Sequence, residues 1–223
     1  MNAAKRIYWF AAFFLKGTEM KTKICLLILL LLPSLAAAAP SVKGSTGNID
    51  TPSADVLRPG QAAIGYYNLD GEKSTVGGIS AGKDIEVSAA YTENRQKDDF
   101  TKVNIKYAIA QEGVFAPGVA VGVEDIGDRS ERTAYVVASK SLPQGIRLHV
   151  GGGNGNYDGV FFAIEKKLVP LSVGGVFPDS SLIVENNGHH MNYGLRMALS
   201  PGLKMTTGWR GGDPFIAISY NYY

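Results

Sequence analysis

The chain has 223 residues, with 22 Lys and Arg against 20 Asp and Glu, so its formal net charge at pH 7 is +2. Both signs are scattered and form no basic cluster, which argues against a nucleic-acid-binding protein. The 27 glycines and 11 tyrosines are typical of a chain in which many strands turn tightly and aromatic rings gather at interfaces. We therefore expect one all-β domain, with no nucleic-acid partner and no cofactor.

Residues 1–39 have the features of an export signal. Lys21 and Lys23 precede an apolar run at 24–32, and small residues follow at 36–39. This order of positive, apolar and small regions predicts a secretory signal that is cleaved near residue 39. A permanent helical anchor is the weaker alternative, because the apolar run is far shorter than the roughly 20 residues that a membrane-spanning helix needs.

A second short apolar run lies in residues 1–19, ahead of Met20. We interpret Met20 as the true start of translation, and a single long signal is the alternative. The only cysteine, Cys25, lies inside the predicted signal. The exported chain is therefore expected to have neither a disulfide nor thiol chemistry.

Residues 40–59 form a lead-in that is rich in Gly, Ser, Thr, Pro and Asp and shows no sustained alternation. We interpret it as an irregular segment that lines or plugs the inside of a barrel. The alternative is a flexible terminus of the exported chain.

From residue 60 to 223 the chain alternates between apolar and polar residues, most clearly at 101–109, which predicts strands with one apolar face. Their lengths are close to what a tilted strand needs to cross a bilayer. We predict an all-β, transmembrane, antiparallel up-and-down β-barrel of about 12 strands (range 10–14). Residues 171–177 are interpreted as a long turn, since an even strand number keeps both termini on one side. The predicted strands are 62–66, 74–82, 85–91, 101–109, 119–123, 134–138, 146–150, 160–164, 182–185, 191–199, 203–209 and 216–222.

The connections between these strands alternate between two chemistries. One set is acidic and rich in Gly and Asn, at 70–73, 93–99, 125–130, 153–158, 186–189 and 211–213. The other holds most of the prolines, at 82–84, 116–118, 142–145, 170–178 and 200–202. With the N-terminus in the periplasm, the acidic set is expected outside the cell.

The face opposite the apolar one carries charges of both signs. In a membrane barrel these residues face the lumen, whereas in a soluble secreted β-sandwich, the alternative, they would form the solvated outer faces. We expect the Arg and Lys of the set to pair with its Glu across a mostly occluded lumen; a small diffusion pore is a further alternative. The candidate lumen-facing residues are Glu86, Lys102, Lys106, Glu124, Arg147, His149, Glu165, Arg196, Lys204 and Arg210.

The last nine residues, 215–223, alternate and end on an aromatic residue, as does the C-terminal strand that the outer-membrane insertion machinery recognises. Their apolar set ends at Tyr222, one residue before the terminal position. Outer-membrane lipid and the insertion machinery are therefore the expected partners.

The sequence contains no recognisable catalytic, cofactor-binding or metal-binding motif. The histidines are His149, His189 and His190, and the last two are interpreted as solvated loop residues. A barrel enzyme acting on lipid or peptide remains the alternative, because such enzymes use His at the barrel mouth. The acidic stretch 125–131 lacks the spacing of a calcium loop and is interpreted as a polar turn.

Residues 44–67 resemble the N-terminal signature of YjbH-like outer-membrane proteins, and 122–127, 139–143 and the Gly-rich hairpin after His149 are also similar. The resemblance implies a barrel linked to exopolysaccharide production, with polysaccharide as a partner and no catalytic residue to transfer. Typical members are several times longer, so this chain would be a single-barrel version. We predict a non-enzymatic outer-membrane barrel of a diderm (Gram-negative or other) bacterium that supports exopolysaccharide export or surface assembly.

Overall fold

The computed structural model describes residues 39–168 and 178–222. Residues 1–38 of the predicted signal and the predicted turn at 171–177 lie outside these ranges. The helical turns within them are two short 3-10 segments, η1 (Pro143–Gly145) and η2 (Gly155–Tyr157). Across the described parts of the chain, no helix has the length and apolar character required to span a membrane.

Two short strands, β1 (Ala39–Pro40) and β2 (Thr46–Gly47), pair with each other in a small separate sheet. Twelve longer strands of 7 to 11 residues follow along the chain. They are β3 (Ala62–Leu69), β4 (Glu72–Ser80), β5 (Ile85–Asn94), β6 (Phe100–Ala110), β7 (Gly118–Glu124), β8 (Thr133–Leu142), β9 (Ile146–Gly153), β10 (Gly159–Lys167), β11 (Ser180–Asn186), β12 (Met191–Ser200), β13 (Leu203–Arg210) and β14 (Asp213–Tyr222).

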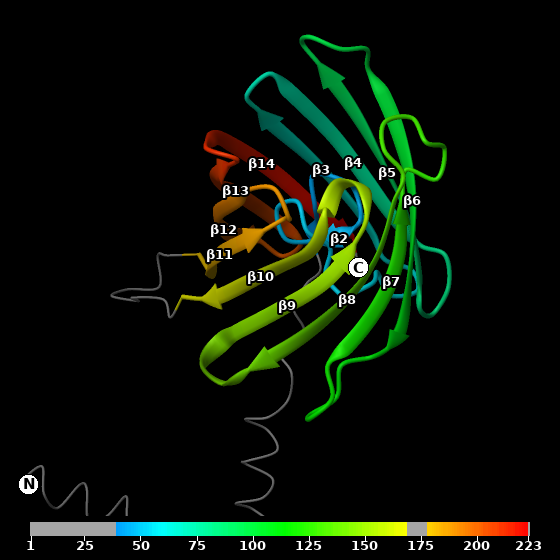
Figure 1. Ribbon diagram of the computed structural model, residues 1–223. Helices are drawn as coiled ribbons and strands as arrows, with labels where there is room; N and C mark the ends of the chain where they lie inside the picture. The colour runs from blue at the N-terminus through cyan, green and yellow to red at the C-terminus, as the bar shows by residue number, and fades with distance from the viewer. Residues whose placement is uncertain (1–38, 169–177, 223) are drawn as a thin grey trace, which may run out of the picture. The chain divides into compact units, whose positions relative to one another are not determined.

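The twelve longer strands form a closed antiparallel barrel in which each strand pairs with its neighbours in sequence (Figure 1). β14 closes the ring by pairing with β3, so Tyr222 lies opposite Ala62. Each segment predicted from alternation corresponds to one of these strands, and the predicted all-β, up-and-down barrel of about 12 strands is confirmed. The register shifts once between β6 and β7 and once between β12 and β13.

The wall of the barrel has an apolar outer face and a polar inner face. In β6 the apolar odd-numbered side chains from Val103 to Ile109 are 40–55% exposed, whereas Lys102, Asn104 and Lys106 are 1–9% exposed. Successive side chains of a strand point to opposite faces, which explains the alternation. The same outward apolar set continues around the barrel and includes Ile64, Ile79, Val136, Val150, Ile164, Leu182, Tyr193 and Ile216.

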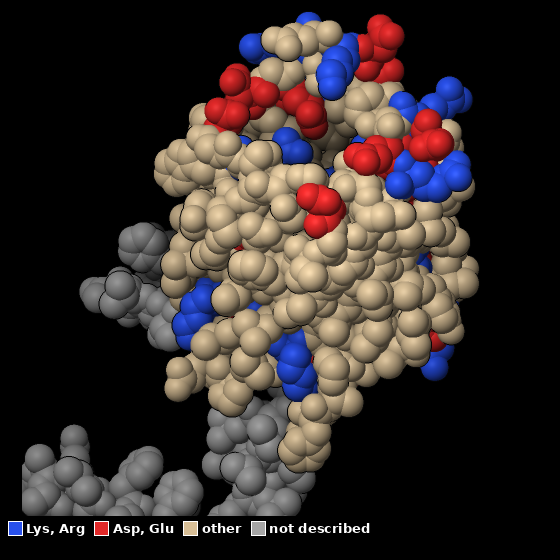
Figure 2. Space-filling model, in the orientation of Figure 1, with Lys and Arg blue, Asp and Glu red and all other residues tan. Residues whose placement is uncertain are grey.

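The connections lie at two rims, because successive strands are antiparallel. One rim carries the acidic, Gly- and Asn-rich connections, and the other carries the described Pro-containing ones together with the start of β3 and the end of β14. Figure 2 shows Lys, Arg, Asp and Glu gathered at the rim that is uppermost in that view, above a wall of mostly uncharged side chains. The outer surface is therefore apolar between two polar rims.

Residues 41–57, which we call the plug, lie inside the ring of strands, where β2 is visible in Figure 1. Every residue from Ser41 to Ala54 except Lys43 is buried. The interior of a 12-strand barrel is wider than side chains of the wall alone can fill, and the plug occupies this space.

Candidate functional site

The plug is folded on itself before it contacts the wall. The N–H of Val42 donates to the carbonyl oxygen of Ile49 at 2.9 Å, and the N–H of Asn48 donates to that of Thr51 at 2.8 Å. A side chain on Gly47 would collide with the carbonyl oxygen of Thr51, so this turn requires glycine. The plug is thus a compact turn with a defined shape.

Glu86 on β5 binds the plug at two places, at Thr46 in β2 and at Leu57 near the end of the plug. Its carboxylate accepts the N–H of Thr46 at 2.8 Å, the hydroxyl of Thr46 at 2.8 Å and the N–H of Leu57 at 3.0 Å. The ammonium of Lys106 on β6 lies 3.6 Å from Glu86 and donates to the carbonyl oxygen of Thr46 at 2.8 Å. We call Glu86 and Lys106 the Glu86 anchor; it is a buried ion pair whose remaining hydrogen bonds all go to the plug.

Glu185 on β11 binds the tip of the plug, which comprises residues 49–51. Its carboxylate accepts the N–H groups of Ile49 at 3.0 Å, Asp50 at 2.7 Å and Thr51 at 3.3 Å, and the hydroxyl of Thr51 at 2.8 Å. Asn192 on β12 donates to the same carboxylate at 2.8 Å. We call Glu185 and Asn192 the Glu185 anchor. Three successive backbone N–H groups converge on one carboxylate, the arrangement by which backbone turns bind anions.

The carboxylate of Asp50, at the tip, points back into the wall. It accepts from Nε of Arg210 at 2.7 Å and from the side-chain amides of Asn187 at 2.8 Å and Asn192 at 3.2 Å. Burial raises the pKa of Asp50, but the charges of Arg210 and Lys43 together with these hydrogen bonds outweigh it and hold this pKa below its usual range. Asp50 is therefore held ionised.

Arg196 on β12 binds the plug as a hydrogen-bond donor, whereas Glu86 and Glu185 bind it as acceptors. Its Nη2 donates to the carbonyl oxygen of Asn48 at 2.8 Å, and its Nη1 lies 3.9 Å from the carboxylate of Glu165 on β10. Guanidinium groups are suited to this role because they remain charged and present several donors in one plane. The wall thus satisfies both the N–H groups and the carbonyls of the buried plug, as buried backbone requires.

Arg147 on β9 links the C-terminal part of the plug to a connection of the barrel. Its Nη2 lies 2.8 Å from Oδ1 of Asp55 in the plug and 3.1 Å from Oε2 of Glu112, which lies between β6 and β7. Glu112 also accepts the N–H of Ser141 at 2.7 Å. Arg147 therefore contributes a further attachment of the plug, close to the rim where β3 begins.

His149 lies next to Ser139, the pair that a barrel hydrolase would need. Nδ1 of His149 is 2.7 Å from Oγ of Ser139, which also accepts the N–H of Ala54 at 2.8 Å. Both side chains are buried beneath the plug, and within the described residues Nε2 of His149 has no hydrogen-bond partner. In the part of the chain that the structure describes, no carboxylate is hydrogen-bonded to the imidazole as it would be in a catalytic triad. The geometry suits a contact that positions the plug at Ala54.

Three aromatic side chains pack together beside the plug. The ring of Tyr157 in η2 lies 5.8 Å from that of Tyr135 on β8 and 4.5 Å from that of Phe161 on β10. The hydroxyl of Tyr157 donates to Glu124 on β7 at 2.7 Å, and the ammonium of Lys43 in the plug lies 4.0 Å above the Tyr157 ring. The plug therefore covers the ring of Tyr157 by a cation–π contact.

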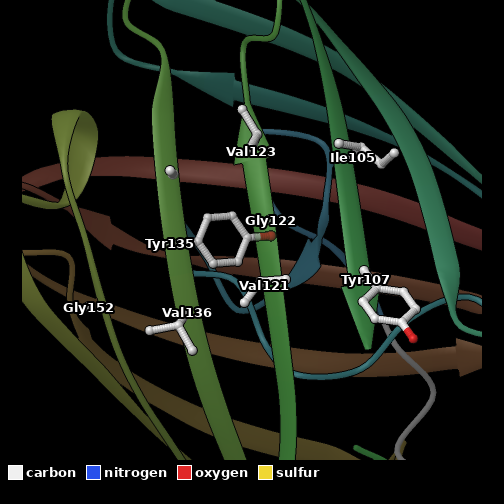
Figure 3. A pocket seen from close by; sticks show the side chains of 9 residues that line it. Ile105, Tyr107, Val121, Gly122, Val123, Tyr135, Val136 and Gly152 are labelled. Atoms are coloured by element: carbon white, nitrogen blue, oxygen red, sulfur yellow. The ribbon is translucent and has the colours of Figure 1, made fainter. Parts of the chain in front are cut away.

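Glycines in the wall make room for these rings. Figure 3 shows the ring of Tyr135 reaching from β8 to Gly122 on β7, where any side chain would collide with it. On the outer side of the same strands lies an open apolar groove of about 550 Å³. We assign it to the outer wall and not to the lumen, because its large side chains are exposed outward; they include Ile105, Tyr107 and Val136.

The acidic stretch after β7 forms a polar turn, as predicted. The carboxylate of Asp125 accepts the N–H groups of Arg129 at 2.9 Å, Ser130 at 2.7 Å and Glu131 at 3.1 Å. Burial raises the pKa of Asp125, but these three hydrogen bonds outweigh it and hold the pKa below the usual value. The carboxylate of Asp125 thus accepts hydrogen bonds from the backbone of its own turn.

The structure places all ten candidate lumen residues on the buried side of their strands. Six are less than 10% exposed: Glu86, Lys102, Lys106, Glu124, His149 and Arg196. The other four lie nearer the strand ends and are half-buried: Arg147, Glu165, Lys204 and Arg210. Two of the expected pairs of Lys or Arg with Glu form, Lys106–Glu86 and Arg196–Glu165, and other residues of the set contact the plug, which lies between the walls. The pair Lys106–Glu86 joins adjacent strands, and Glu124 binds Tyr157 and the plug residue Ser45.

Sequence reasoning missed Glu185 and Asp50, which carry the tip of the plug. Residues 182–184 are all apolar, so alternation in the sequence does not show which face Glu185 takes; in the structure Leu182 is exposed and Ile183 is buried, which places Glu185 on the inward face. Asp50 lies in an irregular segment without periodicity, so its direction could not be inferred.

Two porins of known structure are similar to this chain. The KdgM porin has 10% sequence identity and a TM-score of 0.50, with 73% of this chain and 98% of that chain covered. A triple mutant of the Rhodopseudomonas blastica porin has 10% identity and a TM-score of 0.34, with 69% of this chain and 56% of that chain covered. The similarity to the KdgM porin shows a shared fold. No curated protein sequence matches the chain.

The family comparison bears on the plug directly. The family YjbH, described as exopolysaccharide biosynthesis protein YbjH, matches residues 41–170. The match includes the whole plug and runs from the plug through the end of β10, which confirms the resemblance noted at residues 44–67. This chain is therefore a member of the YjbH exopolysaccharide biosynthesis family, in the form of a single 12-strand barrel.

Proposed function

We propose that this protein is a non-enzymatic outer-membrane barrel that supports exopolysaccharide export or surface assembly and whose lumen is closed by its own plug. The observation that carries the proposal is the plug itself. Residues 41–57 are bound to the inner wall through Glu86, Glu185, Arg196 and Arg147. A segment bound so extensively is part of the working structure of the barrel.

The outer surface supports a place in the membrane. Large apolar side chains that are 40% exposed or more surround the barrel, and soluble proteins seldom expose continuous apolar surface on this scale. Strands of 7 to 11 residues fit the length that tilted strands need to cross a hydrocarbon core of about 30 Å. The proposed orientation has the acidic connections outside the cell and the plug entering from the periplasm.

The family description supports the link to exopolysaccharide. The inner wall supports a role without bond-breaking chemistry, because the contact between Ser139 and His149 binds the plug at Ala54. We infer a barrel that guides or assembles polysaccharide rather than modifying it.

The test of this proposal is conductance in planar bilayers with and without the plug. The intact barrel is expected to conduct little, because the plug fills the lumen. A variant that lacks residues 41–57 should show stable channels. The control is mobility on a denaturing gel before and after heating, which establishes that both chains form folded barrels.

Steady large channels in the intact protein would disprove the closed lumen, as would an equally small conductance without the plug. In cells, a deletion strain should lose surface polysaccharide and recover it when the wild-type gene is restored. Unchanged polysaccharide in that strain would refute the exopolysaccharide role.

A further inference from the structure

The C-terminal part of the plug is attached to the wall by an ion pair that solvent can reach. Nη2 of Arg147 on β9 lies 2.8 Å from Oδ1 of Asp55, and we call this pair the latch. The side chain of Asp55 is 28% exposed, whereas that of Asp50 at the tip is 1% exposed. A solute that enters at the rim where β3 begins can therefore reach the latch while the rest of the plug stays in place.

Asp55 uses only part of the guanidinium of Arg147. Nε and Nη2 lie on the same edge of this group, and Nε is buried without a hydrogen-bond partner among the described residues. Asp55 binds Nη2 alone and shares it with Glu112, which lies 3.1 Å away. Arginine binds carboxylates and phosphates best through two parallel hydrogen bonds. An oxyanion that is free to turn can engage both nitrogens, which Asp55 does not.

Positive charges surround the carboxylate of Asp55 from several parts of the wall. In addition to Arg147, Lys106 on β6 and Lys204 on β13 interact with it electrostatically. Such interactions are stronger inside a protein than in bulk water, because the effective dielectric constant is lower. The space that this carboxylate occupies is therefore favourable for a negative charge.

The wall carboxylates of this region do not cancel that charge, because each lies next to a cation. The pairs are Lys106–Glu86 at 3.6 Å, Arg196–Glu165 at 3.9 Å and Lys140–Glu112 at 3.5 Å. Arg147 and Lys204 add two further positive charges, and Asp55 offsets one of them. When Asp55 moves away, these side chains together have an excess of two positive charges.

His149, two residues beyond Arg147 on the same face of β9, adds a second buried group with unused capacity. It is 2% exposed, and its Nε2 has no hydrogen-bond partner in the described parts of the chain. Its Nδ1 contacts Ser139, whose hydroxyl oxygen accepts the N–H of Ala54, the residue before Asp55. A movement of Ala54 and Asp55 would thus leave a hydroxyl and an imidazole near the guanidinium, and both can donate to an oxyanion.

We propose that the space filled by the Asp55 carboxylate is the binding site of a multivalent oxyanion, with phosphate or carboxylate groups, that enters at the rim where β3 begins. The oxyanion binds the Nε–Nη2 edge of Arg147 and takes the place of Asp55. It thereby detaches Ala54 and Asp55 from the wall, while Glu86 and Glu185 still hold the plug at Thr46 and at the tip. The inference goes beyond the proposed function, because it does not depend on polysaccharide.

The test is calorimetric titration of the complete barrel, with its plug, in detergent. Pyrophosphate is the phosphate probe and citrate is the carboxylate probe, and NaCl keeps the ionic strength constant so that screening does not change. Asp55→Asn removes the competing charge and nearly preserves the shape of the side chain. This variant should bind pyrophosphate about tenfold more tightly than the wild type, the effect of one charge-assisted hydrogen bond.

Substitutions at Arg147 test the site itself. In the Asp55→Asn background, Arg147→Gln should weaken binding about tenfold or more. Arg147→Lys should have an intermediate affinity, because it keeps the charge and loses the planar edge. The matched control is Arg132→Gln, which removes an arginine at the opposite rim and should leave the affinity unchanged. Mobility on a denaturing gel before and after heating checks folding; if Arg147→Gln fails to fold, Arg147→Lys decides.

Hydrogen exchange tests the opening of the latch. In the wild type, pyrophosphate should accelerate exchange at the N–H of Ala54, which is bound to Ser139. Exchange at the N–H of Asp50, which is bound to Glu185, should not change. Pyrophosphate binding without faster exchange at Ala54 would overturn the latch.

Three further results would overturn the inference: no binding of either probe, equal affinity of the wild type and Asp55→Asn, or an affinity that does not depend on Arg147. Binding of only one probe supports the site and identifies its ligand group as phosphate or carboxylate. These outcomes are separate from the proposed function. Large channels in the intact protein would refute the closed lumen and leave the anion site standing, whereas a barrel that binds no anion can still be closed by its plug.

Discussion

The two anchors of the plug, Glu86 and Glu185, use the same chemical group in different electrical surroundings. Glu86 has a full cation beside it, since Lys106 lies 3.6 Å away on the adjacent strand. Glu185 has no Lys or Arg within 4.0 Å among the described residues and accepts three backbone N–H groups and two side-chain donors instead. The charge of Glu86 is balanced by Lys106 of the wall. The charge of Glu185 is stabilised largely by hydrogen bonds from the plug.

This difference indicates which contacts depend on the plug being present. The Glu86 anchor keeps its ion pair when the plug leaves, whereas the Glu185 anchor loses most of its donors and depends on water or a ligand to replace them. A buried charge without partners is costly. We therefore expect the tip to leave last and to be the part that a ligand must replace.

The largest effect is expected when the cation of the Glu86 anchor is removed. Lys106→Met leaves Glu86 as a buried charge without its ion-pair partner and removes a donor to Thr46. Breaking a buried pair from one side costs about 3–5 kcal/mol. Hydrogen exchange at the N–H groups of Thr46 and Leu57 should accelerate accordingly, and exchange at Asp50 should change less.

The control is the double variant Lys106→Met with Glu86→Gln, in which no unpaired charge remains. It should recover much of the lost protection, because replacing both partners of a buried pair is far less destabilising than removing one. Equal loss in the single and the double variant would show that the charge of Glu86 is not what Lys106 balances.

A smaller effect is expected when a low pH protonates Asp50 at the tip of the plug. The pKa of Asp50 is lower in the folded barrel than its ordinary value of 3.8, so the ionised form binds better to Arg210 and the two amides. A lowered pKa means that this stabilisation is complete above that ordinary value and is lost as the pH falls through the lower pKa of the folded state. Protection at Ile49 and Thr51 should thus fall only below about pH 4.

Asp50→Asn separates this group from the other carboxylates. The variant should already have lost about 1.5–3 kcal/mol of tip stability at neutral pH, the value of a hydrogen bond to a charged group. It should then show a smaller further loss in acid than the wild type. The same acid-induced loss in both proteins would assign the transition to another carboxylate.

The barrel was predictable from sequence, and the binding of the plug was not. Alternation such as that of 101–109 reports which side of a strand is apolar, and twelve such segments define the barrel. The plug has no period: the partners of Thr46 and Asp50 lie 40 and 160 residues away in the chain, at Glu86 and Arg210. Only the closed ring brings these groups together, so sequence reasoning could propose a plug but could not identify Glu185 as its anchor.

The smallest effect is expected at Lys43, which touches neither anchor. Its ammonium lies over the ring of Tyr157, and its carbonyl oxygen accepts from Asn104, a bond that any side chain at position 43 preserves. Lys43→Met should therefore lose the cation–π contact, about 0.5–2 kcal/mol, and the charge that helps to keep Asp50 ionised, seen as a modest fall in the thermal midpoint and in protection near residue 43. Lys43→Arg should keep the cation–π contact, since guanidinium also binds aromatic faces.

Because Lys43 shares no hydrogen-bond or ion-pair partner with Lys106, the losses of stability from Lys43→Met and Lys106→Met should add in the double variant. A double loss larger than the sum would mean that the plug leaves the lumen as one rigid unit, and then the two anchors could not release separately.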